Sequence, residues 1–390
     1  ISKASKGINL SEDIFAGYNN LLRGGSVEFK EYVQVGKGRD VGMQQIYKFE
    51  AKLSQGAAEQ SISRDVSRML GRVDFFRLLS YYFGGIGHYL SSVLTVAAIW
   101  LLVYLLLGLA LFQHEKIGDR PMVPIGTLQV ALAGVGLLQT APLFCALLLE
   151  RGIWAALTEL AQVFISGGPL YFVFHIRTRD YYYTQTILAG GAAYRATGRG
   201  FVTQHASFAE TFRFFAMSHL YLGLEMIAAL ILFACFTDVG QYVGRTWSLW
   251  FAALAFLYAP FWFNPMSFEW ERVREDMVTF EAWMRTTGGS ATNSWETWWK
   301  EENKWVKQLK DVSARLYLVA RSSIWLMVAA GLLYKPIIVD GKMEQLTFLL
   351  EHLVVLSILF ACNNWLEGRS RSRDYQGHYA IIRGLMFLLA

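Results

Sequence analysis

The residues with the clearest chemical potential lie near the start of the chain, in the triplet Ser11-Glu12-Asp13. A carboxylate within hydrogen-bond reach of an attacking hydroxyl can take its proton, which contributes a factor of about 10²–10⁴ in rate. The same triplet is also a common helix start, because Ser11 can cap a helix and acidic residues favour the positive end of its dipole. Taken alone, the triplet is compatible with both interpretations.

Candidate phosphate-binding residues follow in the same polar segment. In the run GKGRD at 36–40, the glycines let backbone N–H groups approach a phosphate, and Lys37 and Arg39 can neutralise its charge. A solvated turn is the alternative interpretation of this run. The segment also contains Lys52, Gln60 and Arg64, each of which could equally be an ordinary surface residue.

Several classes of function lack support in the sequence. It contains no Walker loop, dinucleotide-binding glycine fingerprint, HExxH motif or nucleophile elbow. Its three cysteines, Cys145, Cys235 and Cys362, lie in apolar stretches without metal-ligand spacing, so we expect neither a disulfide framework nor a zinc site. The formal net charge of +5 is modest and indicates basic loops rather than a nucleic-acid surface.

The elements that would position these residues belong to a membrane protein. Of the 390 residues, 54% are hydrophobic and only 17% are charged, against ~25% charged in a typical soluble domain. The hydrophobic residues form blocks of roughly 20, which at ~1.5 Å per residue can cross ~30 Å of hydrocarbon. We expect spans near 93–112, 126–149, 219–237, 247–263, 322–339 and 346–362. A further apolar run begins at 379, where we expect a truncated span. Because the sequence starts at Ile1 and stops within that run, we expect this sequence to be part of a longer chain.

Polar and amphipathic segments separate these spans. Residues 1–72 are mixed in character, with a helix signal over 14–22. The pattern over 73–92 predicts an amphipathic helix lying in the membrane surface, and the alternation of tryptophan with charge over 293–305 predicts a second one.

Basic residues predict the orientation. The loops 175–218, 264–321 and 363–378 are rich in Lys and Arg, so the positive-inside rule places them in the cytoplasm with residues 1–92. This requires the stretch 126–174 to cross only once. Breaks at 150–152 and 166–169 therefore favour an interfacial or re-entrant element after 149.

Several runs resemble the family of plant callose synthases and fungal 1,3-β-glucan synthases, and are closer to the plant branch. They are SKASKGINLSEDIFAG at 2–17, LRGG at 22–25, QVGKGRD at 34–40, GGAAYRATGRGFV at 190–202, FWFNP at 261–265 and SWETWW at 294–299.

The resemblance implies a membrane-integrated, inverting glycosyltransferase that polymerises glucose from UDP-glucose and passes the growing 1,3-β-glucan through its helices. The implied fold is a mainly α, polytopic membrane bundle (93–390), preceded by the end of a cytosolic GT-A-like domain (1–72) and an interface helix (73–92).

By similarity to processive β-glycan synthases, Asp13 is the expected catalytic base with Glu12 beside it. Gln60 and Arg64 resemble their Gln-x-x-Arg-Trp motif, although the spacing differs and no Trp follows Arg64. Lys37, Arg39 and Lys52 are the expected contacts of the UDP phosphates.

The resemblance also implies surroundings and partners. It implies a plasma-membrane location, contact with membrane lipids, a regulatory GTPase, and a divalent cation held by residues upstream of this sequence. The basic loop around Arg195 fits lipid phosphate as well as nucleotide. Two alternatives remain: a transporter, and a noncatalytic membrane subunit that only shapes a pore.

Overall fold

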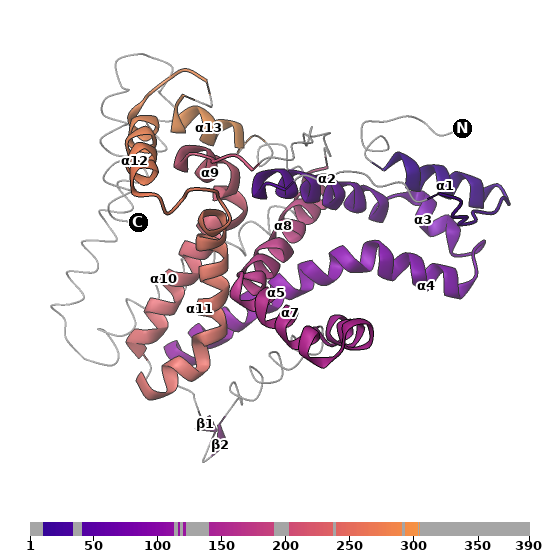
Figure 1. Ribbon diagram of the computed structural model, residues 1–390, viewed down its shortest axis with the longest axis horizontal. Helices are drawn as coiled ribbons and strands as arrows, with labels where there is room; N and C mark the ends of the chain where they lie inside the picture. Colours follow the sequence, from indigo (N-terminus) through magenta and orange to yellow (C-terminus); the bar gives the residue numbers. More distant parts are fainter. Residues whose placement is uncertain are drawn as a thin grey trace.

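The structure is a computed structural model that describes residues 11–33, 41–112, 116–117, 120–121, 140–190, 203–236, 239–290, 293–302 and 304 (Figure 1). In these ranges the chain is mainly helical, which confirms the mainly α character of the predicted fold. The two short strands described, β1 (Lys116–Ile117) and β2 (Arg120–Pro121), form an antiparallel pair. The regular elements described within 1–72 are the helices α1, α2 and α3, and the GT-A-like domain stays a prediction.

Helices make up most of the described chain. They are α1 (Glu12–Leu22), α2 (Met43–Ser61), α3 (Arg64–Met69), α4 (Phe75–Gly84), α5 (Ile86–Phe112), the helical residues 140–151, α7 (Ile153–Ile165), α8 (Gly168–Ala189), α9 (Phe208–Phe215), the π-helical turn η2 (Ala216–Leu220), α10 (Tyr221–Phe236), α11 (Val239–Trp262), α12 (Trp270–Arg285) and α13 (Trp295–Glu302).

An apolar core lies where α5, α10 and α11 pack together, with side chains such as Leu106, Met226 and Phe256 almost fully buried. Among the described residues, two helical stretches are long and apolar enough to cross a membrane, Ile86–Leu106 and Phe208–Ile231. The first begins earlier than the predicted span 93–112, and the second begins well before 219. Helix α11, predicted as a span over 247–263, does not meet the same condition of length and composition. The predicted spans at 322–339 and 346–362, the run from 379 and the loop 363–378 lie outside the described residues, as does most of 126–149.

Helix α8 occupies the centre of the molecule, where it packs against α2, α5 and α11 (Figure 1). It meets α7 at a bend of 63°, and together the two are apolar enough to form a broken span or a re-entrant loop, the kind of element expected after 149. The bend occurs at Gly167, whose φ of +84° suits glycine and whose missing side chain leaves room for Trp262. The segment 175–218, expected to be a loop, is instead largely helical.

A second, aromatic core joins the polar ends of the helices. Phe215 and Trp298 are buried in it, together with residues of α2, α8 and α12. Trp298 packs against Trp283 and Phe212, with ring centroids 6.0 and 5.6 Å apart. The helix expected in the tryptophan-rich segment is therefore present as α13, and protein contacts account for the burial of Trp298. Its predicted place at the membrane surface remains untested.

Helix α4 carries the apolar surface expected of the interface helix. Asp74 caps it by accepting a hydrogen bond from the Arg77 backbone N–H at 3.1 Å. Phe75, Phe76 and Phe83 are 68%, 79% and 66% exposed. The helix ends at Gly84 and α5 begins two residues later, so this surface lies directly before an apolar helix.

Candidate functional site

The triplet Ser11-Glu12-Asp13 starts helix α1, as expected. Glu12 and Asp13 are exposed in the first turn, where the helix dipole favours a negative charge. Ser11 occupies the cap position, but its side chain makes no capping hydrogen bond. The expectation that its hydroxyl caps the helix is therefore wrong, and the reason is that the hydroxyl bonds elsewhere.

The partner of Ser11 is Gln60, near the end of α2. Its Nε2 donates to Ser11 Oγ at 3.1 Å, and its Oε1 accepts from the Tyr18 hydroxyl at 3.3 Å. The Tyr18 hydroxyl also hydrogen-bonds the hydroxyl of Tyr81 on α4. Burial and then the bond to Tyr81 raise the pKa of Tyr18, which keeps the phenol protonated. A chain of polar contacts thus fixes the start of α1 on α2 and α4.

The other expected substrate-binding residues are spread over different places. Lys52 is half-buried on α2, whereas Arg64 is exposed at the start of α3. Lys37 and Arg39 lie outside the described residues. The structure therefore brings Gln60, and not Arg64, into contact with the triplet.

Replacement of Gln60 by leucine tests the role of this contact. The variant removes the Gln60 partner of Ser11 Oγ and one of the two hydrogen bonds of the Tyr18 hydroxyl, so we expect a loss of about 1–3 kcal/mol of unfolding free energy. The measurement is denaturant unfolding of the full-length protein in detergent. Ser67→Ala is the control. Ser67 is exposed and its hydroxyl donates to the nearby Arg64 carbonyl, so this variant should change the free energy of unfolding by less than ~0.5 kcal/mol.

A buried ionic cluster, missed by the sequence analysis, joins α2 to α8. Glu50 Oε1 accepts from Arg179 Nε at 2.8 Å, and Glu50 Oε2 lies 3.3 Å from His175 Nε2. Burial alone would raise the pKa of Glu50, but the hydrogen bonds and positive charge of His175 and Arg179 together lower it below its usual value. The spacing of His175 and Arg179, one helical turn apart, was the available signal.

This cluster predicts a dependence of stability on pH. Because the folded state lowers the pKa of Glu50, its stabilisation is fully present above its usual pKa of 4.5 and is lost as the pH falls through the lower folded value. In Glu50→Gln this acidic loss should be absent. The unfolding midpoint measured between pH 6 and pH 3, a range that extends below the usual pKa of 4.5, should therefore fall more steeply for the natural protein than for the variant. Parallel slopes would contradict this role of the carboxylate.

A second buried ion pair lies in the same stretch of α8. Arg177 and Asp180 are 5% and 4% exposed and form an ion pair, and Thr184 Oγ1 donates to Asp180 Oδ1 at 3.2 Å. Arg177 Nε also donates to the Ser218 carbonyl at 2.7 Å. Ser218 lies in the π-helical turn η2, where one carbonyl loses its regular helical partner. The arginine thus stabilises an irregular turn between α9 and α10.

Two cavities border this turn and the first half of α2. One of about 450 Å³, the amide cavity, is lined by Gln44, Gln45, Lys48, Gln204, Thr211 and Asn264 among others. The other, of about 460 Å³, is the aromatic cavity; it is lined by Gln44, Tyr47, Lys48, Tyr181, Tyr182, Glu210, Arg213, Phe214, Met217, Ser218, Trp298, Glu301 and Glu302. Glu12 and Asp13 line neither. Gln44 and Lys48 are common to both cavities.

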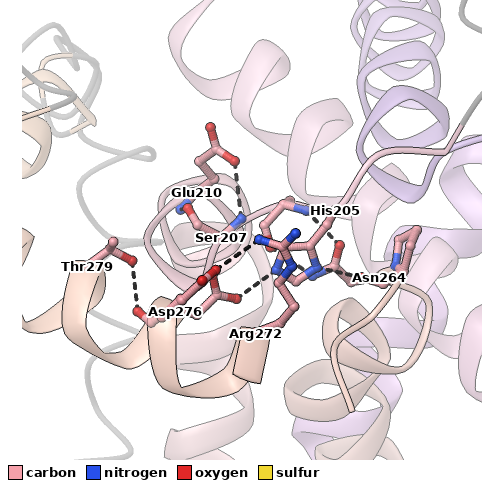
Figure 2. A network of polar contacts seen from close by, with 10 residues as sticks. His205, Ser207, Glu210, Asn264, Arg272, Asp276 and Thr279 are labelled. Carbon is pink, nitrogen blue, oxygen red and sulfur yellow. Dashed lines mark hydrogen bonds and ion pairs between the residues drawn. The ribbon is translucent and has the colours of Figure 1, made fainter. Parts of the chain in front are cut away.

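Figure 2 shows the polar network that supports the wall of the amide cavity. Asn264 exchanges two hydrogen bonds with the backbone of Ala206, at 2.9 and 2.8 Å. The Nε2 atom of His205 lies 2.9 Å from Asp276 Oδ2, and its Nδ1 atom contacts the Pro265 carbonyl. Both ring nitrogens of His205 thus face oxygen atoms. These contacts join the segment before α9 both to α12 and to the connection between α11 and α12.

Within the described residues, no group of three or more His, Cys, Asp or Glu side chains could hold a metal ion. The expected divalent cation was assigned to residues upstream of this sequence, so this observation does not test it.

The fold and the site define a mainly helical protein with apolar helices long enough to cross a membrane and with ionic clusters and cavities at the polar ends of the bundle. The family model described as "1,3-beta-glucan synthase component" matches residues 1–349, and the chain belongs to this family.

The relatives agree with this family. The chain is 40% identical over 408 residues to callose synthase 3 and 38% identical over 403 residues to callose synthase 7, both from Arabidopsis thaliana. Each match covers 100% of the chain but only 21% and 20% of the relative. Callose synthase 11 of the same organism is 41% identical over 319 residues, which cover 79% of the chain and 18% of that relative. The chain therefore spans about a fifth of the length of the curated relatives it matches. No solved structure matches it.

Proposed function

We propose that the protein containing this chain is a processive, inverting synthase that polymerises glucose from UDP-glucose into 1,3-β-glucan and passes the polymer across the plasma membrane. Membership of the 1,3-β-glucan synthase component family supports the class of product. The relatives named callose synthases support the same class of product. Conversion of an α-linked donor into a β-linked product needs a single in-line displacement, so one base and a stabilised diphosphate leaving group suffice.

The observation that carries the proposal is the hydrogen bond between Gln60 and Ser11. It fixes the start of α1 and leaves the carboxylates of Glu12 and Asp13 exposed, ready to meet an acceptor hydroxyl. Asp13 is the base in this proposal, and Glu12 lies beside it. Lys37, Arg39, Lys52, Gln60 and Arg64 bind the nucleotide sugar, and any divalent cation is held by residues upstream.

The membrane arrangement belongs to the same proposal. Residues 1–92 face the cytoplasm, where UDP-glucose is found, and the apolar helices α5 and α10 lie among several crossings. The exposed phenylalanines of α4 rest in the lipid surface, next to the first apolar helix. A GTPase regulates the assembled enzyme.

The test is incorporation of labelled glucose from UDP-glucose into alkali-insoluble polymer by the full-length protein. The polymer should be degraded by a hydrolase specific for 1,3-β links, and Asp13→Asn should abolish its formation. Full incorporation by Asp13→Asn would instead favour a noncatalytic pore subunit or a transporter that accompanies a separate synthase.

A further inference from the structure

The aromatic cavity carries side chains that no part of the proposed catalytic site uses. Its walls come from α2, α8, α9, η2 and α13, and its volume of about 460 Å³ falls within the ~300–1,000 Å³ typical of small-molecule sites. Five aromatic side chains line it together with seven polar or charged ones, so it is more polar than a typical drug-binding pocket and can offer both ring faces and hydrogen-bonding groups to a ligand.

Two polar atoms on its walls lack a hydrogen-bond partner. Gln44 Nε2 and Trp298 Nε1 are both buried donors with no acceptor within reach in the described part of the chain. Trp298 is only 4% exposed. Buried donors are nearly always paired, so two unpaired donors on one cavity call for an explanation. A bound molecule with hydroxyl oxygens would provide the missing acceptors.

The charges of the cavity select against an anionic ligand. Lys48 and Arg213 contribute two positive charges, and Glu210, Glu301 and Glu302 contribute three negative ones, so the lining has a net charge of −1. A diphosphate placed there would face three carboxylates. A neutral molecule avoids this repulsion.

The donor and acceptor inventory favours a carbohydrate. Carboxylates only accept hydrogen bonds, whereas ammonium, guanidinium and indole groups only donate them. A hydroxyl group does both and can therefore pair with every kind of polar group on these walls. The ring carbons of a sugar can meanwhile pack against aromatic residues such as Tyr181 and Phe214.

We propose that the aromatic cavity binds a stretch of neutral 1,3-β-linked glucan, with Gln44 Nε2 and Trp298 Nε1 donating to its hydroxyl groups. This inference rests on the proposed function for the identity of the sugar. Gln44 and Gln60 lie at opposite ends of α2, about 24 Å apart at ~1.5 Å per residue, so the cavity holds glucan away from the bond-forming end. Gln44 and Lys48 also line the amide cavity, which offers the chain a polar wall on which to continue.

The test is equilibrium binding of a tritium-labelled 1,3-β-linked glucose hexasaccharide to the full-length protein in nanodiscs, without UDP-glucose. The variants Gln44→Met and Trp298→Phe each remove one donor, and each should weaken binding by about 3- to 10-fold. Neither should lower the melting temperature through a lost hydrogen bond, because both donors are unpaired in the empty cavity. Loss of binding without loss of stability distinguishes ligand contact from a structural role.

Matched controls exist in the same chain. Gln55, on α2, and Trp283, on α12, also carry a buried polar atom without a partner, but neither lines the cavity. Gln55→Met and Trp283→Phe should bind the hexasaccharide as the natural protein does. The inference is overturned if the natural protein does not bind it, if the cavity variants bind normally, or if the controls weaken binding equally.

Asp13→Asn separates this inference from the proposed function. If that variant makes polymer at the normal rate while the cavity variants still lose hexasaccharide binding, the proposed base is wrong and the cavity assignment stands. If it stops synthesis and the cavity variants bind normally, the cavity assignment fails alone.

Discussion

Asp13→Asn in the full-length protein is expected to reduce the rate of 1,3-β-glucan synthesis by about 10²–10⁴-fold, the usual contribution of a general base. Asparagine retains the size of the side chain and its place in the first turn of α1, but it cannot accept the proton of the acceptor hydroxyl. Because the side chain is exposed, the fold should be unaffected. The measurement is initial incorporation of labelled glucose at saturating UDP-glucose.

The kinetic pattern identifies the role of Asp13. A base acts in the transition state, so kcat should fall while the KM for UDP-glucose changes little. Glu28→Gln is the matched control, because Glu28 is an exposed carboxylate of the same N-terminal part whose ion pair with Lys30 lies on the surface. That variant should retain full activity. A rise in the KM for UDP-glucose with kcat unchanged would assign Asp13 to substrate binding rather than to proton transfer.

The sequence could predict the local features of this site but only part of its assembly. The acidic first turn of α1 followed from Ser11-Glu12-Asp13, since helix starts are specified by neighbouring residues. The choice of Gln60 as a site residue came from a family resemblance, and its contact with Ser11 joins residues 49 positions apart. No local pattern encodes such a contact, because it depends on how α1 packs on α2.

The contacts of the charged residues of α8 were not predicted, for a related reason. The basic segment that includes Arg177 and Arg179 was assigned to a cytoplasmic loop from its excess of Lys and Arg, a pattern that says nothing of which carboxylates these side chains meet. In the structure each of these arginines has a carboxylate partner, Asp180 and Glu50 respectively. The i,i+3 spacing of Arg177 and Asp180 could have been recognised from the sequence, whereas Glu50 lies on another helix. Paired charges allow the helix to continue where unpaired charges would have ended it.

Asp180→Ala should be among the most destabilising single substitutions in the described part of α8. It leaves the Arg177 guanidinium buried without its carboxylate, and breaking a buried pair in this way typically costs about 3–5 kcal/mol. The loss should also disturb η2, because Arg177 hydrogen-bonds the Ser218 carbonyl. The measurement is the free energy of unfolding in mixed detergent micelles, followed by the change in helical circular dichroism.

A double substitution shows whether the unpaired charge is the cause. Arg177→Met combined with Asp180→Ala removes both charges, so the double variant should be more stable than Asp180→Ala alone even though it has lost two polar groups. Glu275→Gln provides the surface comparison, since the Arg272–Glu275 pair is exposed and should contribute less than about 1 kcal/mol. If Asp180→Ala and Glu275→Gln are equally stable, Arg177 must reach water in the folded protein. The buried pair could then not be what allows α8 to run through the centre of the bundle.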